Sequence, residues 1–251
     1  GLLVLVGCLE SSLRLEFAVG SMAITSLILL GAHYRDFPAD LGTFHEALNL
    51  VRRTLPVGVA LICTSLAISV PIWIYQSVAG DSAVGQFYPA VHLQAAAVIV
   101  VSGVCQAQSS RVSAAFADRD FVAFRSMLRP MLQFAGILGS LGILAAATFG
   151  AGLIRTVFSA AFSIAWENLV LFAIAVLFFL LSSVLGFAAT ASRRFHLMWR
   201  PYLAVPAVAS STAAVLIPWL GAPGLPLALT AGAVAACCAP LFVLRRTGAF
   251  R

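Results

Sequence analysis

The chain has 251 residues, of which 61% are hydrophobic and only 10% are charged, and its mean hydropathy is +1.02. A soluble domain of this size carries roughly 25% charged residues, so this chain has too little polar surface to face water on all sides. Its net charge is +6, and its fifteen basic residues are all arginines. Because these arginines lie between apolar runs, we interpret them as determinants of membrane topology and exclude nucleic acid as a partner.

The chain opens in the middle of an apolar run. We predict the tail of a helix over residues 1–9 and a spanning helix over 12–33. The first residue is Gly1, and the basic segment that opens a signal peptide is missing. We therefore expect the sequence to be the C-terminal part of a longer polypeptide, in which residues 1–35 hold the last helices of a first, truncated bundle.

Residues 36–55 are predicted to form an amphipathic linker. Apolar residues recur there at helical spacing between polar ones, at Phe37, Leu41, Phe44 and Leu48. We expect this segment to be a helix that lies on the cytoplasmic surface of the membrane and joins two bundles.

Six further apolar runs are each near the ~20 residues that cross the hydrocarbon core of a bilayer. They are 56–77, 86–108, 130–150, 166–191, 201–220 and 224–244. Two of the connections, 111–129 and 151–165, carry apolar residues at helical spacing and are predicted to be amphipathic. The sequence therefore predicts an all-α membrane protein in which residues 56–251 form a six-helix transmembrane bundle.

The arginines are unevenly divided between the two sets of loops. One set, together with the C-terminus, holds thirteen of them, whereas the opposite set holds only Arg14 and Arg155. Because cytoplasmic loops of membrane proteins are enriched in basic residues, we expect the first set and the C-terminus to be cytoplasmic.

The sequence contains no pattern typical of a catalytic or metal site. It lacks a glycine-rich phosphate loop with lysine, a zinc-protease motif and a serine-hydrolase elbow. Its five cysteines lie in apolar runs without the spacing of zinc ligands. We therefore expect neither an enzyme nor a bound metal or cofactor. The predicted spans also have no acid at their centres, so no carboxylate proton relay is visible.

Polar side chains inside the predicted spans are the candidates for a substrate cavity. They are Ser69, Gln76, His92, Gln94, Gln106 and Gln133. A polar group buried in hydrocarbon needs a hydrogen-bonding partner or water. Each of these groups therefore either bonds to a neighbouring helix or lines a cavity, and the sequence leaves both open.

Three prolines inside the predicted spans are candidates for a helix kink or hinge. They are Pro71, Pro206 and Pro240. Prolines are tolerated in membrane helices, so a role in helix packing alone is the alternative interpretation.

Short motifs between residues 55 and 150 carry a family resemblance. They are Leu55-Pro56-Val57-Gly58 and Val84-Gly85-Gln86-Phe87, each at the start of a span, and Phe116-Ala117-Asp118-Arg119-Asp120 in the loop that follows. On these motifs the chain resembles the polysaccharide, or lipid-linked oligosaccharide, flippases of the multidrug/oligosaccharidyl-lipid/polysaccharide exporter (MOP) superfamily. One departure concerns Pro71. Many members have a polar or basic residue beside this proline, whereas both of its neighbours here are apolar.

The resemblance implies two six-helix bundles, as in MOP and MATE transporters, of which this chain would supply the second bundle and one to two helices of the first. It also implies a function: a transporter that flips a lipid-linked oligosaccharide or polysaccharide precursor across the bacterial inner membrane by alternating access. The implied substrate is a polyprenyl-diphosphate-linked glycan. The implied partners are the lipid bilayer, a glycan polymerase and export machinery.

Three alternatives remain open. A multidrug/cation antiporter of the same superfamily would need a membrane-embedded acid, which an upstream segment could supply. A polyprenol-dependent glycosyltransferase or polymerase would need acids or arginines in large outer loops, and the outer loops here are short. The third alternative is a structural membrane subunit with no transport role.

Overall fold

The computed structural model describes residues 44–157 and 164–248. The chain divides into two compact units, residues 1–49 and 50–251, and the second unit holds nearly all of the described residues. The predictions for residues 1–35 and for the first part of the 36–55 linker lie outside the described residues.

Within the described ranges all regular secondary structure is helical, with no strand. Its elements are α3 (Phe44–Ala79), α4 (Asp81–Ala107), α5 (Ser109–Ala117), α6 (Phe121–Val157), α7 (Trp166–Ala191), the 3₁₀ turn η1 (Phe195–Leu197), α8 (Trp199–Leu220) and α9 (Gly224–Arg246). All but the short α5 and η1 are long and apolar enough to cross a membrane, which gives six candidate spans. The structure thus confirms the predicted all-α membrane fold.

The ends of α6 differ most from the prediction. The sequence predicts a span over 130–150 with separate amphipathic segments on either side, whereas the structure has one helix of 37 residues. At about 1.5 Å per residue this helix is about 55 Å long, well beyond the ~30 Å hydrocarbon core. Its ends therefore extend beyond the core, which explains why they are amphipathic.

Helix α3 also extends beyond the predicted span, at its beginning. This helix runs without interruption from Phe44 to Ala79, so the second half of the predicted 36–55 linker is the start of the same helix as the first predicted span. The prolines do not end their helices either, because Pro71, Pro206 and Pro240 all lie inside continuous α-helices. A hinge role for these prolines stays a prediction.

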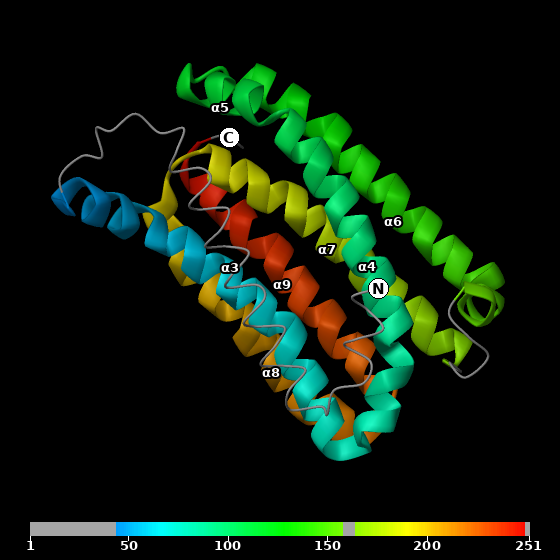
Figure 1. The fold of residues 1–251 in the computed structure, drawn as a ribbon. Coiled ribbons are helices and arrows are strands. Elements are labelled where there is room, and N and C mark those ends of the chain that lie inside the picture. The colour runs from blue at the N-terminus through cyan, green and yellow to red at the C-terminus, as the bar shows by residue number, and fades with distance from the viewer. Residues whose placement is uncertain (1–43, 158–163, 249–251) are drawn as a thin grey trace, which may run out of the picture. The chain divides into compact units, whose positions relative to one another are not determined.

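Helices α7 and α9 lie at the centre of the bundle, with α6 packed on α7 and α8 packed on α9 (Figure 1). Small residues bring the helices together. A Cβ atom added to Gly232 of α9 would lie 2.9 Å from the Cβ atom of Ala209 on α8, which is too close for any larger residue. Such close approach is how helices associate in lipid, where packing contacts replace the hydrophobic effect.

Two connections at the end of the bundle remote from α5 are very short. A single residue, Gly80, joins α3 to α4, and residues 221–223 join α8 to α9. Gly80 has φ +84° and Gly221 has φ +65°. These left-handed values favour glycine because it has no Cβ atom.

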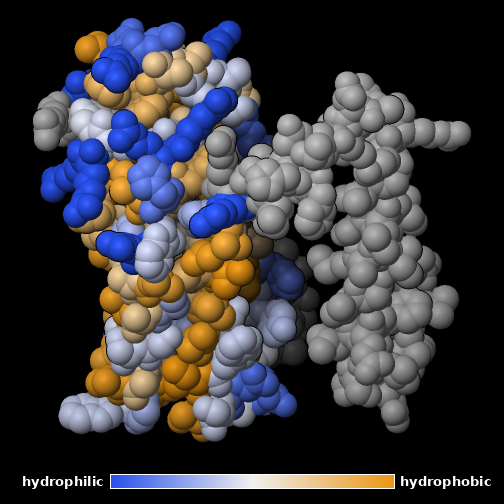
Figure 2. Space-filling view, turned by 90° about the vertical axis from the view of Figure 1, so that its left-hand side faces the viewer, coloured by the Kyte–Doolittle hydropathy of each residue, from blue (hydrophilic) through white to orange (hydrophobic). Residues whose placement is uncertain are grey.

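The sides of the bundle are apolar, and its polar side chains gather at the ends. Large apolar residues such as Phe149 and Trp219 are 72% and 86% exposed. Figure 2 shows hydrophilic side chains concentrated at the end where α5 lies and α9 terminates, above a mostly hydrophobic flank. Exposure of this much apolar surface fits contact with lipid. The chain is therefore a multi-pass membrane protein.

Candidate functional site

The six predicted cavity residues do not converge on a single site. Gln94 is buried, Ser69 is half-buried, and the other four are exposed. Their helices are α3 for Ser69 and Gln76, α4 for His92, Gln94 and Gln106, and α6 for Gln133. Two of them, Gln94 and Gln76, lie in two separate cavities.

The first cavity, here called the α4–α6 groove, lies between α4 and α6 and has α7 as its floor. Its volume is about 300 Å³. Among the residues that line it, Gln94 has the only polar side chain. The others are apolar, and half of them are glycine or alanine, including Ala90, Ala97, Gly142 and Ala145 beside larger residues such as Phe172 and Val176.

The groove exists because α6 sits close to α7 while α4 stays apart from α6. Two glycines of α6 make this close approach possible. A Cβ atom at Gly139 would lie 2.5 Å from Cδ1 of Leu177, and one at Gly150 would collide with Cδ2 of Leu169. By contrast, a Cβ atom at Gly142 would have nothing within 4 Å. The helix therefore uses one face for packing on α7 and leaves the neighbouring face open to the groove.

Gln94 lies near the middle of α4, about 20 Å from either end of the helix at 1.5 Å per residue. The residue is only 7% exposed. Among the described residues, none forms a hydrogen bond with its side-chain amide. Within the described ranges, Asn168 Oδ1 is the only fully buried side-chain polar atom without a partner, so the amide of Gln94 is accessible from the groove and offers a donor and an acceptor to a ligand.

The second cavity, here called the outer cavity, lies between α3, α4, α7 and α9 at the end remote from α5. Its volume is about 390 Å³. It lies beside the tight turn at Gly80, where α3 ends and α4 begins. Gln76 Nε2 donates a hydrogen bond to Asp81 Oδ1 across this turn, at 2.8 Å.

Aromatic residues surround the polar pair of the outer cavity. Trp73 and Tyr88 are more than half exposed, and Phe87 and Phe172 are buried beside them. Trp and Tyr are typical of the level where a membrane helix leaves the hydrocarbon. A carboxylate among aromatic faces can bind an organic cation by charge and by cation–π contact.

The remaining predicted residues lie outside both cavities. The ring of exposed His92 lies 5.8 Å from that of Tyr88, one helical turn earlier. Gln133 lines a shallow hollow along α6 together with Ser140. Gln106 is exposed in the last turn of α4, and Ser69 is half-buried in α3. A substrate role for these residues stays a prediction.

Three residues of interest escape the sequence analysis. Asp81 and Trp73 line the outer cavity. Asp81 could have been identified from the sequence, because it is an acid that directly follows the glycine after a span. Asn168, near the start of α7, is buried, and its Oδ1 accepts no hydrogen bond within the described part of the chain. A lone asparagine next to an interfacial tryptophan gives no such signal.

No protein-family model and no curated protein sequence matches the chain. Several solved structures match the chain. An outward-facing multidrug resistance MATE family transporter of the MOP superfamily matches with a TM-score of 0.70 and 14% identity, over 94% of this chain and 55% of that one. A MATE protein in complex with MaL6 matches with a TM-score of 0.66 and 14% identity, over 86% and 49% of the two chains. The chain thus spans about half of their length. At this identity the likeness establishes the fold, that of one half of a MATE transporter.

Proposed function

We propose that the chain is part of a membrane transporter that flips a lipid-linked oligosaccharide or polysaccharide precursor across the bacterial inner membrane by alternating access. The α4–α6 groove is the observation that carries the proposal. It is apolar, lies beside the middle of α4 and contains one uncharged polar group, Gln94. A polyprenyl chain matches such a groove, because its methyl-branched hydrocarbon fills space between small residues and needs no charge.

The proposed orientation rests on the arginines. Every arginine whose side chain is described belongs to the end of the bundle at which α5 lies and α9 terminates, on residues 52, 111, 119, 125, 129, 193, 194, 200, 245 and 246. This bias supports a cytoplasmic C-terminus. A glycan polymerase and export machinery are the proposed partners, since they would consume the flipped polyprenyl-diphosphate-linked glycan.

The test is the fate of lipid-linked glycan in a strain that lacks the protein. We expect the glycan to accumulate on the cytoplasmic leaflet, and the intact gene to restore its translocation. Gly142→Leu, which places a side chain in the open space of the groove, should restore translocation poorly, whereas Gln106→Leu, outside the groove, should restore it fully. Normal translocation in the deletion strain, with no redundant transporter present, would refute the proposal.

A multidrug/cation antiporter is the second candidate, and the outer cavity favours it. Asp81 supplies a carboxylate beside Trp73 and Tyr88, which is the chemistry that binds an organic cation. The discriminating experiment is ethidium efflux from cells that express the protein. Asp81→Asn should slow efflux if this function is correct, and Asp118→Asn, an exposed acid at the other end, should not. Absence of any efflux above the vector control would eliminate the antiporter.

A further inference from the structure

A cavity of about 480 Å³ lies at the arginine-rich end of the bundle. It lies where α5 and α7 end, α6 begins and α9 reaches its C-cap. We call it the arginine pocket, and its ten lining residues include three arginines and no acid. The residues that matter below are Phe116, Arg119, Ser192, Arg193, Arg194 and Thr247.

Two of these arginines have an unusual backbone. Arg119 has φ +60° and Arg193 has φ +53°, and no other non-glycine residue in the described chain has a positive φ. Each directly follows the C-cap of a helix, α5 and α7 respectively. Arg119 N–H donates to Phe116 O at 3.2 Å, and Arg193 N–H donates to Thr190 O at 3.0 Å, as expected where a left-handed residue ends a helix.

Glycine is the usual residue at this position, because a side chain there strains the backbone. The third helix that ends at the pocket follows the rule: the C-cap of α9 is Thr247, and the next residue is Gly248 with φ +82°. Arginine thus occupies two of three left-handed positions at which glycine would strain the backbone less. Strain of this kind is commonly retained where the side chain has a function.

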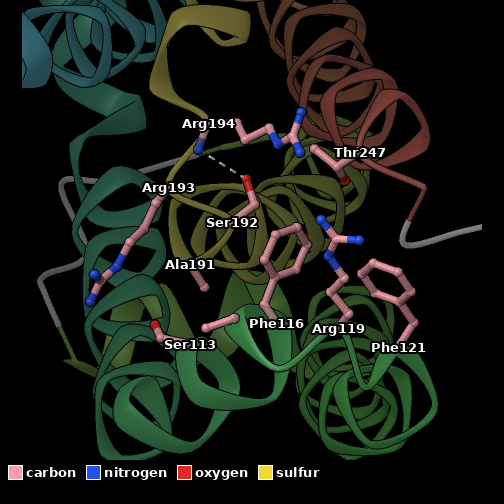
Figure 3. Close-up of a pocket in the computed structure, with 10 residues that line it drawn as sticks. Ser113, Phe116, Arg119, Phe121, Ala191, Ser192, Arg193, Arg194 and Thr247 are labelled. Carbon is pink, nitrogen blue, oxygen red and sulfur yellow. Dashed lines mark hydrogen bonds between the residues drawn. The ribbon is translucent and has the colours of Figure 1, made fainter.

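The side chains are placed to receive a ligand. In Figure 3 the guanidinium groups of Arg119 and Arg194 extend into the space between Ser192 and Thr247, while Arg193 extends the other way. Phe116 lies beside Arg119, and its ring is 5.3 Å from that of fully buried Phe124, which fixes this wall of the pocket.

The arginines of the pocket are not neutralised by any acid in the described part of the chain. No carboxylate there forms an ion pair with Arg119 or Arg194. The nearby Asp120 uses its Oδ1 to accept a hydrogen bond from Ala123 N–H at 2.9 Å, at the start of α6. The ends of α5, α7 and α9 carry about half a negative charge each, which offsets only part of three positive charges.

We propose that the arginine pocket binds the phosphate group of an anionic lipid headgroup in the adjoining leaflet. Guanidinium groups bind phosphate oxygens through paired hydrogen bonds. The pocket lies at the ends of spanning helices, at the level of the headgroups, where basic residues attract anionic lipids. This site does not depend on what the protein transports.

The experiment uses the full-length protein in detergent micelles and fluorescently labelled phosphatidylglycerol, with phosphatidylcholine as the comparison lipid. Arg119→Gly and Arg194→Gln should each weaken phosphatidylglycerol binding about tenfold or more, because each removes a charged hydrogen-bond donor. Arg129→Gln is the matched control, an exposed arginine at the same end that does not line the pocket. It should bind the lipid like the wild type.

Arg119→Gly also guards against misfolding as an explanation. Glycine suits the left-handed backbone at this position, so the variant should melt no lower than the wild type while losing the lipid. Competition with inorganic phosphate identifies the source of the ligand. Displacement of the lipid by phosphate would support a site that also accepts soluble phosphate, and no displacement would support a site for lipid alone. Unchanged lipid binding in both pocket variants, or an equal loss in Arg129→Gln, would overturn the proposal.

Discussion

The packing of α6 on α7 can be tested with two glycines of the same helix. A Cβ atom at Gly139 would lie 2.5 Å from Cδ1 and 2.9 Å from Cα of Leu177, so Gly139→Ala must push the two helices apart. Gly142→Ala adds the same methyl group into open space. The first substitution overpacks a contact that includes backbone, and the second does not.

The expected energies have opposite signs. Overpacking costs about 1–3 kcal/mol, of which the better helix propensity of alanine returns up to about 1 kcal/mol. Gly139→Ala should therefore lose up to about 2 kcal/mol, and Gly142→Ala should gain about 0.5–1 kcal/mol. The two variants should differ by the overpacking cost, about 1–3 kcal/mol, which at about 2–4 °C per kcal/mol is about 2–12 °C in melting temperature.

The assay is thermal unfolding of the purified protein in one detergent, with both variants measured beside the wild type. Equal melting temperatures for the two variants, or a lower value for Gly142→Ala, would show that α6 does not pack on α7 through Gly139. The assignment of the open face of α6 to the groove would then fail as well.

Three further predictions concern stability. Asn168→Leu should raise the free energy of unfolding by about 1–3 kcal/mol in a denaturant titration, because it removes a buried oxygen that has no hydrogen-bond partner among the described residues. A loss of stability would mean that this oxygen is bonded. Arg119→Gly should raise the melting temperature, because glycine relieves the strain of the left-handed backbone at this position. Arg129→Gly, inside α6, should lower the melting temperature, because glycine costs about 1 kcal/mol of helix propensity there. Equal shifts in the two variants would contradict the proposed backbone strain at Arg119. Gly224→Ala should destabilise strongly in the same melt, since its Cβ atom would lie 2.6 Å from a backbone oxygen at the end of α8; wild-type stability would place the α8–α9 turn in doubt.

The spans could be predicted from the sequence because a bilayer imposes both length and composition. The apolar run 166–191 coincides with α7, from Trp166 to Ala191. The predicted ends of α6 were wrong for the same reason: hydropathy reports the hydrocarbon core, and a helix that continues beyond it is amphipathic there and has no continuous apolar run.

The candidate cavities depend on contacts between helices, which periodicity does not reveal. Gln94 and Gln106 look alike in the sequence, and only the position of α6 and α7 buries the first. Likewise, the sequence interprets Arg119 and Arg194 as topology signals, which requires only that they lie at one end. That they share a cavity follows from where α5 and α7 end, and no spacing between residues 119 and 194 encodes it.

The single-residue connection between α3 and α4 restricts how the bundle can move. With only Gly80 between them, and with Gln76 bonded to Asp81 across the turn, neither helix can slide along the other at this end. Any displacement of α3 relative to α4 must therefore be a rotation about a hinge at Gly80, and it grows with distance from the turn. The largest excursions would then occur at the arginine-rich end, where the two helices are furthest from their joint.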